Sequence, residues 1–202
     1  MTITWITPIT CTTTITGTNS RQLTVSSGLT CLVNAKQSGA VTVSPGASLS
    51  VTKSTISGQV TATDPAAVTY CGSTENGTLS ITGATGSVIL GGSLSDGSLC
   101  AADTIPSLIS VTGSTGPVTV TGLKENGTLT LSGDTGGITL SGSSVNGLVH
   151  LENNAGPAVN VAGNTVNGSL SCTGNNPVPS DNGSINIVSG TASGQCAAIA
   201  KR

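Results

Sequence analysis

Six cysteines are the residues with the clearest chemistry, and no two of them form the C-x-x-C pair that zinc sites and thioredoxin-like redox sites use. An even number of dispersed cysteines in a chain with few charges indicates disulfides and an oxidising compartment. A reactive thiol is the less favoured alternative, because no His accompanies any cysteine in the sequence. Among the fifteen pairings open to six cysteines, the placement of one pair at each end and one around an irregular segment favours sequential pairing. The predicted disulfides are Cys11–Cys31, Cys71–Cys100 and Cys172–Cys196.

Two glutamates form the next candidate site. Glu75 and Glu125 occupy a position where other repeats carry Ile56, Val145 and Val166. A carboxylate that faces a core is costly without a partner, so such a departure is a place to suspect a metal or ligand. The alternative is that this side of the repeat faces solvent. Two glutamates in different repeats are weak grounds for a metal site, and we predict neither a metal nor a cofactor.

His150 and Glu152 lie two residues apart and are expected to point outward from one strand. The pair lacks a nearby nucleophile or third ligand. Glycosidases need two carboxyls about 5 to 9 Å apart, whereas the eight acidic residues of this chain are dispersed. We therefore predict that the protein is not an enzyme and has no catalytic residues. A carbohydrate-active β-helix remains a second alternative.

Asparagine precedes glycine at four repeated positions, Asn76, Asn126, Asn146 and Asn167. Three of the four fit the N-x-[ST] acceptor pattern for N-glycosylation. The favoured explanation is structural, because Asn tolerates the left-handed turn conformation and can hydrogen-bond its counterpart in the next repeat. We expect a ladder of turn residues here.

Outward hydroxyl residues form the only extended surface pattern. One expected column runs through Thr42, Thr61, Ser80, Ser110, Thr130, His150 and Ser171, and the next through Ser44, Thr63, Thr82, Thr112, Ser132, Glu152 and Thr173. Such an array resembles the Thr-x-Thr faces of β-solenoid ice-binding proteins. The alternative is that Thr and Ser are simply soluble residues that suit the outward face of a strand.

A sequence repeat positions these residues. Each repeat is marked by a small polar residue followed by Gly. The marker recurs every 19 to 22 residues, except for one spacing of 30 from Asp96-Gly97 to Asn126-Gly127, which indicates an insertion near residues 98–107. Residues 127–146, GTLTLSGDTGGITLSGSSVN, show two strands with alternating apolar residues and a shorter third side. Three short strands per repeat are typical of a parallel β-helix, since one coil cannot bury its apolar face alone. We predict an all-β, right-handed parallel β-helix (β-solenoid) of about eight coils, stapled by disulfides.

Composition agrees with one thin, strand-built domain. Phe is absent, Trp and Tyr occur once each, and only 7% of the 202 residues are charged. We expect an N-terminal cap or incomplete coil at 1–20, the β-helix at 21–190 and a C-terminal tail at 191–202. The start MTITWITPIT has neither a basic beginning nor a continuous apolar stretch, so we expect a mature form from which an export signal has been removed.

The segment NGSLSCTGNNPVPSDNGSINIVSGTASGQC, together with the turns GNTVNG and GSSVNG, resembles poorly characterised secreted β-helical proteins of actinobacteria. The resemblance rests on the cysteine placement and on the terminal S-G-x-x-S-G-x-C pattern. It implies export and a disulfide-stabilised helix, and it carries no activity or site residues.

The expected function is that of a non-enzymatic, secreted structural or surface-interaction module, with ice binding as the alternative. The partner would be an extracellular protein or matrix, or ice. Six scattered basic residues and a formal net charge of −2 argue against nucleic acid, and no apolar run is long enough to enter a membrane. Self-association of the rods through their two ends is a further alternative.

Overall fold

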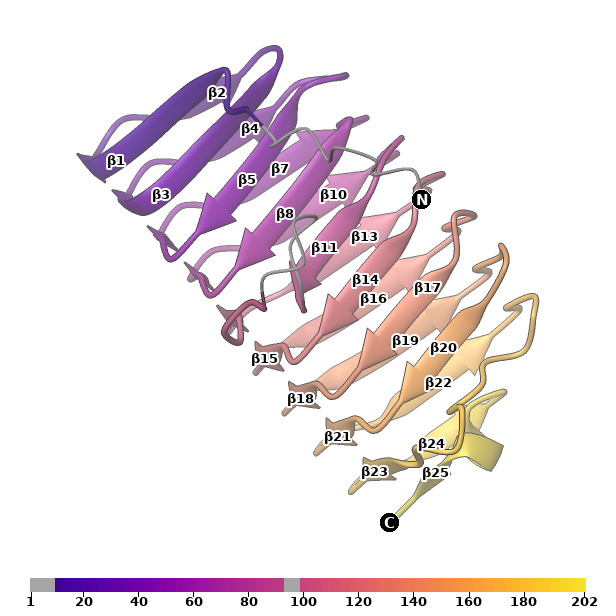
Figure 1. Ribbon diagram of the computed structural model, residues 1–202. Coiled ribbons are helices and arrows are strands. Elements are labelled where there is room, and N and C mark those ends of the chain that lie inside the picture. The colour runs from indigo at the N-terminus through magenta and orange to yellow at the C-terminus, as the bar shows by residue number, and fades with distance from the viewer. Residues whose placement is uncertain (1–9, 93–98) are drawn as a thin grey trace, which may run out of the picture.

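The computed structural model describes residues 10–92 and 99–202, and these residues form a parallel β-solenoid of about nine turns. Successive coils stack along one axis, as Figure 1 shows. Every strand pairs in parallel with its counterparts in the neighbouring coils, in two sheets of nine and sixteen strands. The predicted fold is confirmed.

The strands of the coils lie on three faces, and the nine-stranded sheet is the first face. Its strands are β2 (Leu23–Val25), β4 (Val41–Val43), β7 (Val60–Thr63), β10 (Leu79–Thr82), β13 (Ile109–Thr112), β16 (Thr128–Ser132), β19 (Leu148–Glu152), β22 (Leu170–Thr173) and β24 (Ala192–Gly194).

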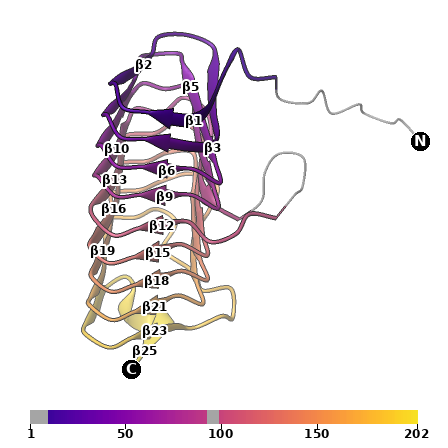
Figure 2. The same ribbon diagram turned by 90° about the vertical axis from the view of Figure 1, so that its left-hand side faces the viewer.

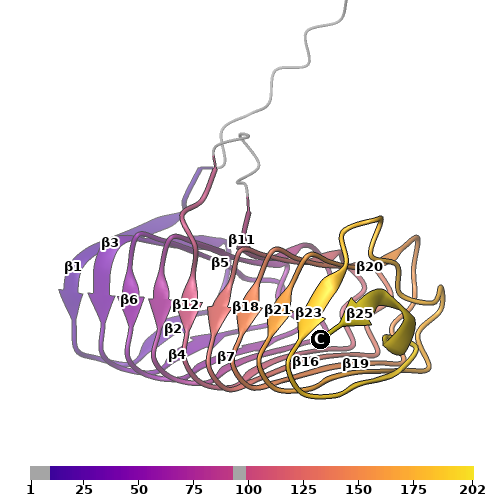
Figure 3. The same cartoon turned by 90° about the horizontal axis from the view of Figure 1, so that it is seen from below.

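The second and third faces belong to the sixteen-stranded sheet, and they are joined because the long strand β3 pairs with both β5 and β6. The second face contains β1 (Thr13–Asn19), β3 (Leu29–Gln37), β5 (Ser48–Thr52), β8 (Ala67–Cys71), β11 (Val88–Gly91), β14 (Val118–Thr121), β17 (Ile138–Ser141) and β20 (Val159–Ala162). The third face contains β6 (Thr55–Ile56), β9 (Thr74–Glu75), β12 (Thr104–Ile105), β15 (Lys124–Glu125), β18 (Ser144–Val145), β21 (Thr165–Val166), β23 (Asn186–Val188) and β25 (Ala200–Lys201). The third face is seen directly in Figure 2, and Figure 3 shows the rod lengthwise with strands of all three faces labelled.

Alternation of apolar and hydroxyl residues builds the core. In the coil of β16 to β18, Leu129, Leu131, Ile138, Leu140 and Val145 are all buried, while the residues that alternate with them within β16 and β17 are partly exposed. In-register pairing then stacks each apolar residue on a similar one in the next coil. Small β-branched and aliphatic side chains suffice because the space between the three faces is narrow. Tyr70 is the largest fully buried side chain.

Glycine is required at the third corner, where the chain passes from the third face to the first face of the next coil. Successive coils approach so closely there that a Cβ atom on Gly147 would overlap the carbonyl group of Gly127, and a Cβ on Gly168 would overlap that of Gly147. The repeated glycine therefore reflects close approach of two backbones. Left-handed residues occur instead at the other two corners, for example Gly133 and Asn153 at the first and Gly142 at the second.

Two details differ from the sequence prediction. The structure has about nine turns, because β1 and β2 already stack on β3 and β4 as a first coil. The residues from Thr104 onward belong to the regular ladder, since β12 pairs with both β9 and β15. The excursion thus leaves after β11 and ends before Thr104, and the marker Asp96-Gly97 lies outside the described residues.

The three predicted disulfides are confirmed, and each ties a peripheral segment to a coil. Cys11–Cys31 fastens the chain ahead of β1, and Cys71–Cys100 fastens the return of the excursion to β8. Cys172–Cys196 joins β22 to the last coil, which contains β24, the short helix η1 (Ala197–Ile199) and β25.

Candidate functional site

The first face carries the predicted first column of outward residues in continuous register. Pairing also extends it by one residue at each end, to Thr24 in β2 and Ser193 in β24. Its members are Thr24, Thr42, Thr61, Ser80, Ser110, Thr130, His150, Ser171 and Ser193. The structure therefore aligns in one column side chains whose first and last members are nearly 170 residues apart in the sequence.

The second predicted column lies beside the first. Pairing places Thr63, Thr82, Thr112, Ser132, Glu152 and Thr173 in one column. Ser44 follows directly after β4 and donates its backbone N–H to the carbonyl of Val25. Within this column the Thr112 hydroxyl donates to the Thr82 hydroxyl at 3.4 Å. Neighbouring hydroxyls thus come within hydrogen-bonding reach along the rod.

Spacing and charge distinguish the part of the first face that runs from β4 to β16. Strand geometry sets the columns about 6.7 Å apart along a strand and the rows about 4.8 Å apart between strands. The ten members there are all Thr or Ser, namely Thr42, Ser44, Thr61, Thr63, Ser80, Thr82, Ser110, Thr112, Thr130 and Ser132. We call these ten residues the hydroxyl face. It ends at β19, where His150 and Glu152 stand in the two columns.

The other faces carry hydroxyls in a less regular way. On the second face, the central outward column runs through Ser50 and Thr69 but is interrupted by Ile89 and Asn160. The third face has a single outward column, because its strands are mostly two or three residues long. Among the described residues, only the first face keeps two hydroxyl columns over five successive strands.

Glu75 and Glu125 both point into the core, with 0% and 1% of their surface exposed. They do not form a joint site, because β12 lies between β9 and β15 and places Ile105 between the two carboxyls. No group of three or more His, Cys, Asp or Glu side chains suited to a metal ion occurs among residues 10–92 and 99–202.

Instead, each glutamate serves the corner that follows it. The backbone N–H of Gly77 donates to Glu75 Oε1 at 2.9 Å, and that of Gly127 donates to Glu125 Oε1 at 2.5 Å. The Tyr70 hydroxyl donates to Glu75 Oε2 at 3.2 Å, whereas Glu125 Oε2 is buried without a partner. Burial raises the pKa of Glu75 to about 8 and that of Glu125 to about 7.

Two further carboxyls, Asp103 and Asp134, are completely buried, and the sequence did not single them out. Oδ1 of Asp103 accepts the N–H of Ser73, and Oδ1 of Asp134 accepts the N–H of Ser114, both at 2.7 Å. The Oδ2 atom of each aspartate has no partner. Burial raises the pKa of both side chains to about 6.

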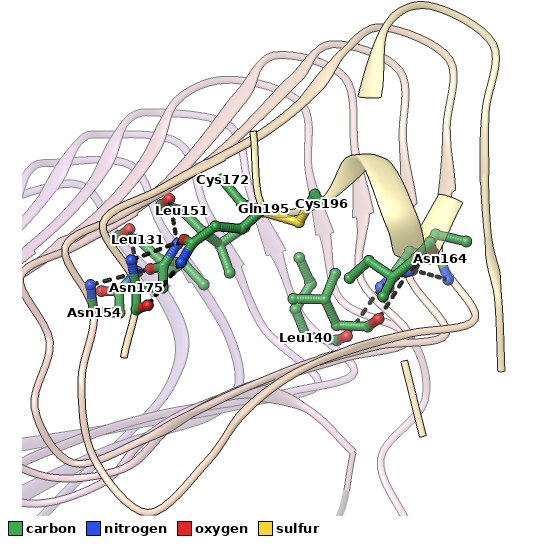
Figure 4. The surroundings of a disulfide bond; sticks show 12 residues. Leu131, Leu140, Leu151, Asn154, Asn164, Cys172, Asn175, Gln195 and Cys196 are labelled. Atoms are coloured by element: carbon green, nitrogen blue, oxygen red, sulfur yellow. Dashed lines mark hydrogen bonds between the residues drawn. A yellow bond between two sulfur atoms is a disulfide. The ribbon is translucent and has the colours of Figure 1, made fainter. Parts of the chain in front are cut away.

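Both aspartates belong to internal polar ladders that line two corners of the solenoid. In the ladder at the first corner, Asn154 Nδ2 donates to the carbonyl of Leu131 and to Asn175 Oδ1. Asn175 repeats the arrangement with Leu151 and Gln195. Figure 4 shows this ladder and, on the other side of the core, Asn164 bonded to the carbonyl of Leu140. The same position carries Ser or Asn in several other coils, and this repeat is the sequence signal that could have identified Asp103 and Asp134.

The asparagine ladder predicted at the third corner is confirmed for three of its four members. Asn146 Nδ2 donates to Asn126 Oδ1, and Asn167 Nδ2 donates to Asn146 Oδ1, each at 2.5 Å. The expected left-handed conformation is wrong, because none of these residues has a positive φ. Asn76 lies apart, since the next coil carries Pro106 at this corner.

His150 lies partly exposed in the first column and Glu152 lies exposed in the second, as expected for outward residues.

A separate hollow at the C-terminal end is lined by Val188, Gly190, Thr191, Ala192, Ala197, Ala200, Lys201 and Arg202. It contains no carboxyl side chain, His or Cys. Among the described residues, the structure has no helix long and apolar enough to cross a membrane.

Comparison with known proteins adds no identification. No family model matches the chain, no curated protein matches it, and no solved structure matches it. The resemblance to actinobacterial secreted proteins therefore stays a prediction, and functional inference rests on the geometry described above.

Proposed function

We propose that the protein is a rigid, non-enzymatic extracellular module that works by presenting its hydroxyl face to a partner surface. The supporting observation is the in-register pairing of β4, β7, β10, β13 and β16, which aligns ten Thr and Ser residues in two columns without a charge between them. The three disulfides fit an oxidising, extracellular location.

Rigidity supports the same function. Both internal ladders and the corner asparagines form side-chain hydrogen bonds between successive coils. A surface whose hydroxyls are already fixed loses little conformational entropy on binding. The array can therefore match a regular partner over many weak contacts at once.

Co-sedimentation with uncharged insoluble matrices, such as cellulose and chitin, and adsorption to ice test this function. A variant with Thr61→Lys and Ser110→Lys places two charges on the hydroxyl face, and it should lose the binding seen with the parent protein. A matched control with Thr119→Lys and Thr139→Lys changes the second face and should bind normally. Equal loss in both variants, or no binding by the parent to any of these surfaces, would contradict the proposal.

Ice binding is the second candidate, and the repeated spacing of the hydroxyl face favours it. Rows about 4.8 Å apart and columns about 6.7 Å apart give methyl and hydroxyl groups a flat periodic arrangement that can order water. We expect inhibition of ice recrystallisation by the parent protein and its loss in Thr130→Lys. The control Thr139→Lys lies in the same coil on β17 and is equally half-buried, so it should keep the effect. Absence of recrystallisation inhibition and thermal hysteresis in the parent protein would exclude ice.

A further inference from the structure

The basic residues, which are scattered in the sequence, gather on one side of the rod. Lys36, Lys124 and Lys201 share the outward column of the third face. Register connects Lys36 to Lys124 through Thr55, Thr74 and Thr104, and Lys124 to Lys201 through Ser144, Thr165 and Ile187. All three lysines are exposed.

The remaining three basic residues flank the same face. Lys53 lies in the turn between β5 and β6 at the second corner. The carbonyl of Arg21 accepts a hydrogen bond from Gln37 Nε2 at 2.7 Å, which places Arg21 at the third corner. Arg202 directly follows β25. All six Lys and Arg residues of the chain therefore lie on or beside the third face.

Among the described residues, no solvent-accessible carboxylate side chain stands in the outward column of the third face. Asp64 is at the first corner, and Glu152 is at the end of β19 beside that corner. Asp181 lies in the loop between β22 and β23, in a turn that meets the second corner where the Ser184 carbonyl accepts the N–H of Gly163. Glu75 and Glu125 belong to strands of the third face but are turned into the core. The part of the third face that the structure describes thus carries positive charge without an exposed carboxylate side chain, although the formal net charge is −2.

We propose that the third face binds an acidic polysaccharide lying along the axis of the rod. Four coil steps separate Lys36 from Lys124 and Lys124 from Lys201, which corresponds to about 19 Å in each case. Duplex DNA presents a charge about every 1.7 Å and calls for a denser row of cations. A polysaccharide with no more than one carboxylate per sugar has a lower charge density than duplex DNA and many hydroxyls, so it fits sparse lysines better.

The groups between the lysines can bind the rest of such a polymer. Thr55, Thr74, Thr104, Ser144 and Thr165 provide hydroxyls along the column. Asn126, Asn146 and Asn167 provide exposed amides at the adjacent corner. Each group donates and accepts hydrogen bonds, as sugar hydroxyls require. This binding goes beyond the function proposed for the hydroxyl face, and it uses a different face.

Retention on immobilised polygalacturonate at low salt tests the proposal. The parent protein should be retained and should elute as sodium chloride rises, because screening weakens contacts between exposed charges. A variant with Lys36→Ser, Lys124→Ser and Lys201→Ser should bind at least about tenfold more weakly. Circular dichroism should show that the variant keeps its fold, since all three side chains are exposed.

Two controls test whether the third face itself holds the polymer. A variant with Asp64→Asn and Glu152→Gln raises the net charge by two on the far side, and it should bind polygalacturonate as the parent does. Thr130→Lys disrupts the hydroxyl face and should also leave this binding intact, so the two proposals can fail separately. Unchanged binding by the triple lysine variant, or duplex DNA held as tightly as polygalacturonate, would overturn the proposal.

Discussion

Asp103 and Asp134 show how a single atom decides the chemistry of a buried position. The two internal ladders are otherwise built mainly from Ser and Asn, and an Asn at such a position donates Nδ2–H to a backbone carbonyl of the preceding coil. An ionised aspartate has no proton to donate, whereas the neutral acid is close to Asn in shape and can donate its O–H. The buried, unpartnered Oδ2 atoms therefore favour the protonated form.

Replacing Asp134 by Asn should stabilise the protein at pH 8 and change little at pH 4. The pKa of Asp134 is raised to about 6, so the wild-type side chain is ionised at pH 8 at the cost of burial, and Asn removes that cost. We expect a gain of about 2 kcal/mol in the free energy of unfolding at pH 8, measured by urea denaturation. The same gain at both pH values would show that ionisation is not its cause.

The glycines of the third corner make the opposite case, since there any side chain is excluded. Gly147→Ala should destabilise the protein by about 2 kcal/mol or more, because the new Cβ would overlap the backbone of Gly127. The neighbouring Ser144→Ala, on an exposed side chain, is the control and should change stability little. Urea denaturation at one pH measures both. Equal stability of Gly147→Ala and the parent would contradict the close approach.

At the scale of the strand, hydrophobic alternation was enough to predict the inward register. Val118 and Val120, for example, were expected inside and are buried. The excursion was placed too late, because the spacing between markers gives its length but does not show between which strands it leaves. The inward direction of Glu75 and Glu125 could not be decided from the sequence either, since a two-residue strand has no alternation to follow.

The coil at each end of the rod has a neighbouring coil on one side only. The disulfide Cys172–Cys196 is therefore important for the stability of the last coil. Each coil of a solenoid is stabilised mainly by its nearest neighbours, and the coil of β24, η1 and β25 stacks on one side only. The double variant Cys172→Ala, Cys196→Ala should therefore lose amide protection selectively in residues 192–201.

Hydrogen exchange followed by mass spectrometry measures this change. The control Cys71→Ala, Cys100→Ala removes a bridge in the middle of the rod, where the coils stack on both sides. It should leave the protection of residues 192–201 unaltered. Uniform loss of protection along the chain in the first variant would show instead that the bridge supports the whole rod.

At the scale of the molecule, the rod divides its few charges between inside and outside. Four of the seven acidic residues that the structure describes are buried, and all six basic residues are exposed on one side. The sequence showed that charges are few, but only the coil register showed where they lie. When the four buried carboxyls are neutral, the folded chain carries more positive than negative charge.

Stability should consequently fall as the pH rises from about 4 to about 8. The pKa values of Glu75, Asp103, Glu125 and Asp134 are raised to about 8, 6, 7 and 6, above those of the unfolded chain. At about pH 3 and below, these groups are neutral in both states and the native state keeps its full stability. As the pH rises, the unfolded chain releases the four protons first, so ionisation favours unfolding until the folded pKa values are passed.

Urea denaturation at pH 4, 6 and 8 without reductant measures this trend, and the transition midpoint should decrease at each step. A variant with Glu75→Gln, Asp103→Asn, Glu125→Gln and Asp134→Asn should show a much flatter profile, because its amides cannot ionise. A transition midpoint that increases with pH in the parent protein would mean that the buried carboxyls are stabilised as anions. A mechanism of that kind would need donors for Asp103 Oδ2, Glu125 Oε2 and Asp134 Oδ2, which have no partner in the structure.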